Sequence, residues 1–293
     1  MTTKAIHCIE QPVKDELLDI YQAFAIVCNK YNLRHWMGYG TMLGAVRHNG
    51  FIPWDDDFDV FMLREDYEKF FSIADKELPT YFKPVTLYNC KAYPTTFGKI
   101  QESRREIYEK LEVEVGYVNP HGLYIDVFPL DAKPEGFFSA AIDALRQGML
   151  FCRHSHIFRS GGHGKLKGRV AGLIGRLLYP LYHSLKTPND FARWGDAIYK
   201  SILDTTSSRL RIGSFQARFQ KRELSFPREA FDETDIVPFE SITVPVPNGY
   251  DACLRSMYGN DYMTPPPLEK RVSEHSLLEK APWYYGPDIN LNP

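Results

Sequence analysis

The sequence predicts an α+β fold, with α/β as the alternative class, built on a small, mixed and mostly antiparallel β-sheet flanked by helices. Apolar residues recur at helical spacing over 13–31, which predicts an amphipathic helix. Residues 57–62 alternate polar and apolar side chains, which predicts a strand. The region 137–184 is predicted mostly as helix, whereas the prolines of the last third forbid long helices there.

The remaining elements follow from local periodicity and turn residues. In chain order they are a strand at 33–37, a glycine turn with a short helix at 38–48, a loop at 48–56, a helix at 65–78, strands at 84–88, 97–100 and 123–130, and a helix at 251–258. We therefore divide the chain into a catalytic core (1–135), a basic helical insertion (136–235) and a proline-rich closing segment packing on the core (236–293).

Composition narrows the class of protein. The formal net charge of −2 over 293 residues argues against a nucleic-acid binder. The five cysteines are scattered and form no CxxC pair, which argues against a disulfide framework or a thiolate zinc site. The N-terminus lacks the apolar stretch of a signal peptide, so a cytoplasmic protein is expected.

One segment is strongly basic. Residues 144–189 hold eight Lys or Arg and no Asp or Glu, which leaves 27 basic against 37 acidic residues elsewhere, a net −10. This segment is a candidate for peripheral contact with the anionic inner face of a membrane, or for guiding an anionic acceptor. The alternative is a helical hairpin whose basic face is merely solvated.

Three carboxylates are the main candidates for chemistry. Alternation places Asp57 and Asp59 side by side on one strand, and Asp126 lies in the middle of another. Such carboxylates repel one another unless a cation lies between them, and Mg²⁺ or Mn²⁺ prefers oxygen ligands. With two metals, Asp126 is a third ligand; with one, it is freer to act as a base. The alternative is a solvated acidic loop.

A glycine turn precedes these carboxylates. Gly38 and Gly40 let backbone amides approach a phosphate, and the start of the following helix adds aligned N–H donors. Thr41 either caps that helix or donates its hydroxyl to a donor phosphate. Gly40 and Thr41 are therefore candidate phosphate-binding residues.

Two cations are further candidates for binding the donor phosphates. Arg47 follows on the same short helix and either neutralises a phosphate or pairs with Asp55 or Asp56. Lys99 lies on a predicted strand between the two carboxylate strands, where it either balances the phosphates or is exposed.

The run from Gly38 to Val60, GYGTMLGAVRHNGFIPWDDDFDV, resembles the motif of the LicD family. That family includes bacterial phosphocholine transferases and is related to fukutin. The glycine turn followed by a two-carboxylate strand also resembles the nucleotidyltransferase superfamily, with Asp126 in the place of its third carboxylate. A second run, 258–275, resembles the closing segment of the family. The resemblance covers residues 20–130 and 238–276, with the middle of the chain unmatched.

The resemblance implies a nucleotidyltransferase-like core and a metal-dependent phosphotransferase. Similar proteins transfer a phospho-alcohol from CDP-choline, CDP-ribitol or a related donor to a sugar hydroxyl of a cell-surface glycan, such as lipopolysaccharide or teichoic acid, and release CMP. Breaking a pyrophosphate calls for a bridging metal, cationic side chains and an aligned hydroxyl.

Three more residues are candidates for substrate binding. Trp54 directly precedes the aspartates and either stacks on a base or a choline cation or packs in the core. Arg271 and His275 lie four residues apart in the closing segment, and only the family resemblance raises them above a surface turn.

Three other functions remain open from the sequence. A DxD nucleotide-sugar glycosyltransferase would release a nucleoside diphosphate. A nucleotidyltransferase proper would release pyrophosphate. A non-catalytic glycan-binding module would have no need of three clustered carboxylates, which are costly to hold together.

Overall fold

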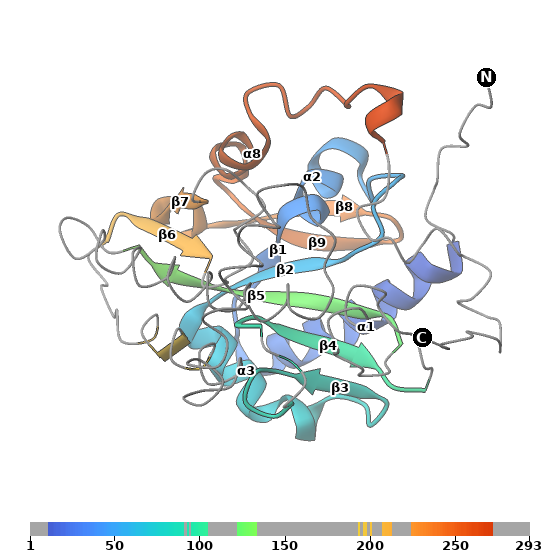
Figure 1. Cartoon of the computed structure of the whole chain (residues 1–293), viewed down its shortest axis with the longest axis vertical. Helices are drawn as coiled ribbons and strands as arrows, with labels where there is room; N and C mark the ends of the chain where they lie inside the picture. The colour runs from blue at the N-terminus through green and yellow to red at the C-terminus, as the bar shows by residue number, and fades with distance from the viewer. Residues whose placement is uncertain are drawn as a thin grey trace, which may run out of the picture.

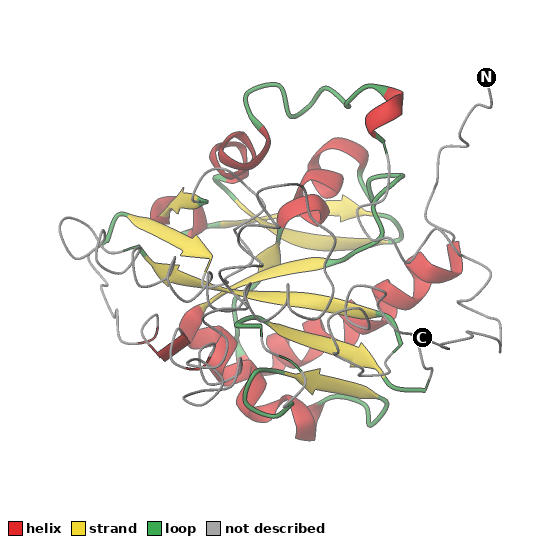
Figure 2. Cartoon of the chain, in the orientation of Figure 1, coloured by secondary structure: helices red, strands yellow, loops and turns green. Residues whose placement is uncertain are grey.

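The computed structural model describes residues 11–90, 93, 95–104, 122–133, 193, 196–197, 200, 207–212 and 224–271. The main helices among them are α1 (Gln11–Tyr31), α2 (Tyr39–His48), α3 (Arg64–Glu77) and α8 (Tyr250–Tyr258). The strands are β1 (Trp36–Met37), β2 (Asp59–Leu63), β3 (Phe82–Val85), β4 (Gly98–Glu102), β5 (Tyr124–Ala132), β6 (Arg209–Ile212), β7 (Ser225–Pro227), β8 (Thr234–Phe239) and β9 (Ile242–Pro247). Helices and strands both contribute to the layers of the molecule, which confirms the α+β class (Figure 2).

Seven strands form one mixed sheet. Its main path runs β1-β2-β5-β4-β3, with β6 paired to β5 and β7 to β6 (Figure 1). The β2–β5 pair is parallel, and the other described pairs of this sheet are antiparallel. The predicted mixed, mostly antiparallel sheet is confirmed, but it is larger than expected. Its extra strands β6 and β7 lie in the segment 136–235, which was predicted to be a helical insertion. At four and three residues they are too short to show a strand period in the sequence.

Among the residues that the structure describes, four α-helices flank the sheet. Helices α1 and α3 follow the predicted helical periods closely and pack against β2, β4 and β5. Helices α2 and α8 contact each other; α2 lies beside β1, β2 and β8, and α8 lies beside β7 (Figure 1). The start of α2 therefore lies next to the strands that carry the predicted carboxylates.

The closing segment contains more regular structure than its prolines suggested. Strands β8 and β9 form a two-stranded antiparallel sheet in which Ile236 pairs with Pro245 and Pro238 with Thr243. Proline is tolerated there because an edge strand leaves some backbone N–H groups without a ladder partner. Val244 and Val246 are fully buried, so the hairpin is part of the core.

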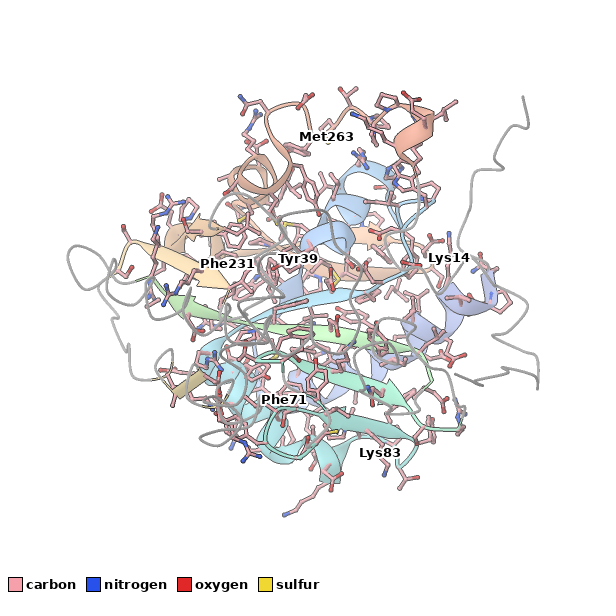
Figure 3. All side chains as sticks on the ribbon, in the orientation of Figure 1. Lys14, Tyr39, Phe71, Lys83, Phe231 and Met263 are labelled. Atoms are coloured by element: carbon pink, nitrogen blue, oxygen red, sulfur yellow. The ribbon has the colours of Figure 1, made fainter. Side chains whose placement is uncertain are left out.

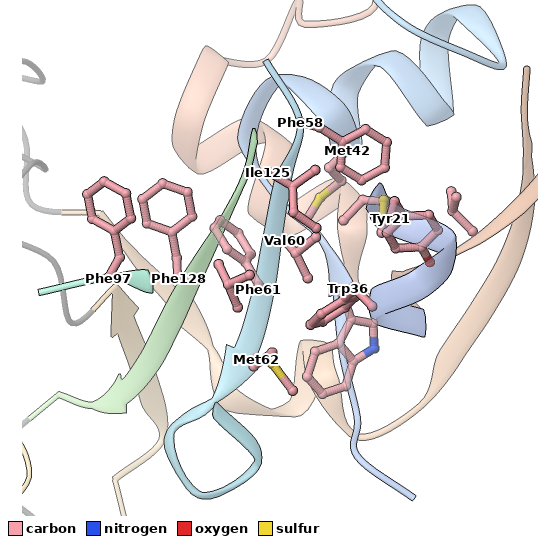
Figure 4. Close-up of a cluster of buried hydrophobic side chains, with 14 of the residues drawn as sticks. Tyr21, Trp36, Met42, Phe58, Val60, Phe61, Met62, Phe97, Ile125 and Phe128 are labelled. Atoms are coloured by element: carbon pink, nitrogen blue, oxygen red, sulfur yellow. The ribbon is translucent and has the colours of Figure 1, made fainter. Parts of the chain in front are cut away.

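The strand of the acidic motif is central to that core. Phe58 and Val60 are fully buried, as the alternation predicted, and Trp36 on the neighbouring β1 is buried with them (Figure 4). Phe128 on β5 stacks on Phe97 with ring centroids 4.6 Å apart (Figure 4). Rigid packing on both faces of these strands fixes the backbone on which the carboxylates stand.

Candidate functional site

Two of the predicted carboxylates stand opposite each other. On the parallel strands β2 and β5, Asp59 is the register partner of Asp126. The Asp126 N–H donates to the carbonyl of Phe58 at 2.9 Å, which fixes the two backbones together. Asp57 differs from the prediction: β2 begins at Asp59, so Asp57 lies in the loop just before the strand. The three carboxylates still gather at one end of β2 and β5.

Electrostatics show that these carboxylates crowd one another. Asp59 is only 5% exposed. Its burial, and then repulsion from Asp57, Asp126 and Asp55, raises the pKa of Asp59 well above its ordinary value. A carboxylate in this position gains from a proton or from a cation that relieves the repulsion.

Lys99 partly offsets this negative charge. On β4 it is the register partner of Asp126, and its Nζ lies 3.4 Å from Asp126 Oδ1. The same ammonium lies 3.3 Å from the ring centroid of Tyr124, a cation–π contact. The side chain is buried rather than exposed, at 4%. This buried cation therefore lies against Asp126, and its charge also acts on Asp59.

Thr41 holds the carboxylate strand against α2. Its Oγ1 accepts a hydrogen bond from the backbone N–H of Asp59 at 2.8 Å in a buried position. The helix begins at Tyr39 with Gly38 as its N-cap and no side-chain cap, so the capping alternative for Thr41 is wrong. The Gly38 N–H in turn donates to the Asp59 carbonyl at 2.8 Å. The turn and the strand are thus joined on both sides of Asp59.

Gly40 permits a close approach at the first turn of α2. A Cβ added at Gly40 would lie 2.2 Å from Oδ2 of Asp55. The Asp55 carboxylate therefore lies against the start of this helix, where an anion is favoured. Tyr39 begins the helix with φ at +34°, a strained value for a residue other than glycine.

A group of cationic and aromatic residues lies around Arg47, in the last turn of α2. The Arg47 Nη1 donates to the carbonyl of Tyr262 at 2.7 Å, so it holds the closing segment. Burial lowers the pKa of Arg47, and the charge of Arg271 lowers it further, against the opposing effects of Tyr258 and Asp55. The Arg271 guanidinium lies 5.0 Å from the ring centroid of Trp54. The structure thus brings together three predicted site residues, Arg47, Trp54 and Arg271.

Sequence reasoning missed Tyr258 at the end of α8. Burial, and then the charges of Asp55, Asp59 and Asp57, raises the pKa of Tyr258 well above its ordinary value. The phenol therefore lies close enough to these carboxylates to respond to their charge. The residue also keeps 39% of its surface exposed, so part of it faces solvent. No spacing in the sequence links Tyr258 to residues two hundred positions earlier; only its place in the closing-segment motif could have suggested it.

The carboxylate set suits a hard divalent cation. Mg²⁺ and Mn²⁺ take carboxylate oxygens, and Mg²⁺ needs only one or two of them because it keeps waters and substrate phosphates. Within the described ranges, no three His, Cys, Asp or Glu side chains already stand as a metal-binding group. The carboxylate oxygens suit such a cation chemically, but they do not form a ready set of three ligands, so further ligands would have to come from water and substrate.

Two predictions fall on residues outside the described part of the chain: His275, and the basic segment 144–189. The helices that are described include none long and apolar enough to cross a membrane.

Comparisons with known sequences define the class of protein. Residues 32–156 match the family described as LicD/FKTN/FKRP, nucleotidyltransferase domain. This match covers less than half of the chain, and it confirms the resemblance seen in the glycine turn and the DxD strand.

A full-length relative adds a particular similarity. The chain is 29% identical over 264 residues to the lipopolysaccharide cholinephosphotransferase LicD of Haemophilus influenzae, an alignment covering 88% of this chain and 92% of that protein. Uncharacterized proteins of Rickettsia prowazekii and Rickettsia typhi are each 54% identical over 37 residues, or 13% of this chain. These matches cover 14% and 12% of the two rickettsial proteins.

Proposed function

We propose that this chain is a metal-dependent phosphotransferase with a nucleotidyltransferase-like core. It moves a phospho-alcohol, phosphocholine in the first instance, from a CDP-linked donor such as CDP-choline or CDP-ribitol to a sugar hydroxyl of a cell-surface glycan, and CMP leaves. The observation that carries the proposal is the pairing of Asp59 with Asp126 on adjacent strands, crowded by Asp57. The full-length similarity to a lipopolysaccharide cholinephosphotransferase supports the same reaction.

Each site residue has a role in this proposal. Asp57 and Asp59 hold Mg²⁺ or Mn²⁺, and Asp126 either completes the ligand set or accepts the proton of the acceptor hydroxyl. When bound, the metal neutralises the charge that develops on the donor pyrophosphate. The Nζ of Lys99 lies 3.4 Å from Asp126 Oδ1, where it balances the charge of that carboxylate and adds positive potential for the phosphates.

The phosphates have a defined place beside the carboxylates. Gly40 and Thr41 lie in the first turn of α2, whose backbone N–H groups favour an anion. Burial is the main cause of the lowered pKa of Arg47, and the charge of Arg271 adds to it; an anion between the two guanidinium groups would relieve that repulsion. His275 would extend this set from the same closing segment.

The transferred head group has a candidate partner in Trp54. Its ring already contacts the Arg271 guanidinium at 5.0 Å, so this ring can bind a cation, and a head-group cation would take the place of Arg271. A quaternary ammonium is attracted to such a face in the same way.

The remaining regions have supporting roles. The insertion (136–235) carries the basic segment 144–189, which contacts an anionic membrane from the cytoplasmic side or guides the acceptor. Co-sedimentation with anionic vesicles tests this. Binding that persists unchanged when Arg169, Arg176 and Lys186 become Gln would contradict it.

The proposed reaction is tested by its nucleotide product. The chain is incubated with Mg²⁺, a glycan acceptor and, in separate reactions, CDP-choline, CDP-ribitol, CDP-glycerol, UDP-sugars, GDP-sugars and nucleoside triphosphates. CMP released from a CDP-alcohol, and lost in Asp57→Asn and Asp59→Asn, is the expected result. A nucleoside diphosphate released from a sugar nucleotide would instead establish a glycosyltransferase, and pyrophosphate released from a nucleoside triphosphate a nucleotidyltransferase.

A further inference from the structure

The tip of the β8–β9 hairpin holds the loop that leads into the acidic motif. Glu240, at this tip, donates its backbone N–H to the carbonyl of Asn49 at 2.8 Å. Its carboxylate Oε1 accepts the backbone N–H of Phe51 at 3.1 Å. Both Glu240 and Asn49 have a left-handed backbone, with φ of +49° and +53°, which is uncommon outside glycine. Residues nearly two hundred positions apart are thus joined at two points.

A third contact fixes the Glu240 carboxylate itself. The Nζ of Lys14, near the start of α1, lies 2.9 Å from the same Oε1 (Figure 3). Gly50 makes room for this oxygen, since a Cβ added there would lie 2.5 Å from it. The carboxylate is therefore held against the backbone of the loop by a cation from one side and an amide from the other.

Aromatic packing links this contact to the carboxylates. The Phe51 ring lies 4.9 Å from that of Phe239, which precedes Glu240, and 5.9 Å from that of Phe58. Phe58 and Phe239 are themselves 5.5 Å apart. Because Phe58 stands between Asp57 and Asp59 in the chain, a shift of the loop at Phe51 would be transmitted to both carboxylates.

We infer that Glu240 is a positioning residue, which holds the loop 49–58 so that Asp55 and Asp57 stand beside Asp59. None of the contacts described for Glu240 is to those carboxylates, so it acts through the Phe51 amide and the aromatic cluster. The inference rests on the proposed function for the role of the carboxylates, whereas the hold on the loop is a separate property.

Hydrogen exchange tests the hold on the loop without any reaction. Glu240→Ala removes the acceptor of the Phe51 amide, and amides of residues 50–58 should exchange about tenfold faster. Glu240→Gln keeps an acceptor oxygen and should restore most of the protection. Lys14→Met removes only one of the contacts of the Glu240 carboxylate, a partly exposed ion pair, and should raise exchange much less than Glu240→Ala does. Unchanged exchange in α3 would show that the effect is local.

Mn²⁺ binding, followed by calorimetry, tests the positioning role. Glu240→Ala should bind Mn²⁺ about tenfold more weakly than the wild type, with Glu240→Gln and Lys14→Met close to it. The inference is overturned if loop exchange is unchanged in Glu240→Ala, or if exchange rises while Mn²⁺ affinity stays the same. A wild-type chain that binds no Mn²⁺ would refute the metal site and with it the positioning role, and the exchange data would still show whether Glu240 holds the loop.

Discussion

The two ends of the strand pair β2 and β5 differ in how their charges are paired: like charges meet at one end, and opposite charges meet at the other. At one end, the buried Asp59 stands opposite Asp126 with like charges around it. At the other, Arg64 follows β2 and makes a two-pronged ion pair with Asp131 of β5, both bonds 2.7 Å long, and a third bond to Asp196 at 3.1 Å. The ends are five residues, or about 16 Å, apart. Charge is matched where the fold needs stability and mismatched where a ligand is expected.

The matched end also fastens a distant part of the chain. Lys200 lies 3.0 Å from Asp196 and 2.9 Å from Glu68 of α3. The hydroxyl of Tyr88 donates to Asp196 at 2.6 Å. Each charge in this network has partners of opposite sign, so removing one leaves others buried without compensation.

The largest effect is expected from removing the charge of Asp59, at the end where like charges are crowded. Asp59→Asn should lower CMP release by about a thousandfold or more, because a metal-binding and charge-positioning group is lost. The same variant, without metal, should unfold at a Tm roughly 2–4 °C higher for each kcal/mol of repulsion removed. Loss of activity together with a lower Tm would show that Asp59 is a structural residue rather than a strained site residue.

The higher Tm expected for Asp59→Asn should depend on pH, because the pKa of Asp59 is raised in the folded state. The proton that Asp59 holds in the folded state stabilises the wild type at low pH, and this contribution is lost as the pH rises through the folded-state pKa. The Tm advantage of Asp59→Asn should therefore be small near about pH 4 and grow toward about pH 7. Thermal melts across this range measure it, and an advantage that shrinks with rising pH would contradict the account.

Removing a charge from the Arg64 end should lower the stability of the fold, whereas Asp59→Asn should raise it. Arg64→Ala removes the two-pronged partner of the buried Asp131 and one of the partners of the buried Asp196, and it should cost about 3–5 kcal/mol of unfolding free energy. Arg64→Lys keeps the charge but loses the planar fork, so it should fall between Ala and the wild type. Urea unfolding gives both values. Midpoints equal to that of the wild type would mean that this network does not stabilise the fold.

A smaller effect is expected where Thr41 meets the strand. Thr41→Val keeps the shape but removes the acceptor of the buried Asp59 N–H, at a cost of about 1–3 kcal/mol. Thr41→Ser keeps the hydroxyl and should retain most of the stability and turnover. The comparison of Val with Ser in urea unfolding and in CMP release separates the hydroxyl from the packing. A loss in Thr41→Ser as large as that in Thr41→Val would contradict the claim that the hydroxyl is the stabilising group.

The smallest effect is expected at an exposed ion pair. Arg255 and Asp251 lie 2.7 Å apart on α8, with about half of each side chain exposed. Solvent and salt screen such a pair, so Arg255→Ala should leave Tm and CMP release unchanged within error. A loss as large as that of Thr41→Val would show that burial does not decide which charges matter here.

Local patterns predicted much of this fold and part of its site. The helical period of residues 13–31 and the alternation of Phe58 and Val60 with polar residues both correspond to buried faces in the structure. These elements are encoded by neighbours in the sequence, so periodicity finds them. The same alternation indicated Asp59 as one of a carboxylate pair, although Asp57 lies outside the strand.

The contacts that sequence patterns missed are long-range. Thr41 bonds to a backbone group 18 positions later, and Tyr258 reaches the carboxylates from α8. Arg64 and Asp196 are 132 positions apart. No local period encodes such pairs, since they depend on how strands and helices stack. The β8–β9 hairpin was missed for a different reason: its prolines indicated loops, but edge strands tolerate them.

The most direct test of the central claim compares the Tm of the wild type and Asp59→Asn with and without Mn²⁺ and CDP-choline. If the carboxylate end of β2 and β5 is left mismatched to receive a cation, these ligands should raise the Tm of the wild type, because they bind the folded state. They should leave the Tm of Asp59→Asn nearly unchanged. An equal rise in both proteins, or none in the wild type, would contradict the claim that this end of the strand pair is a metal-dependent phosphotransfer site.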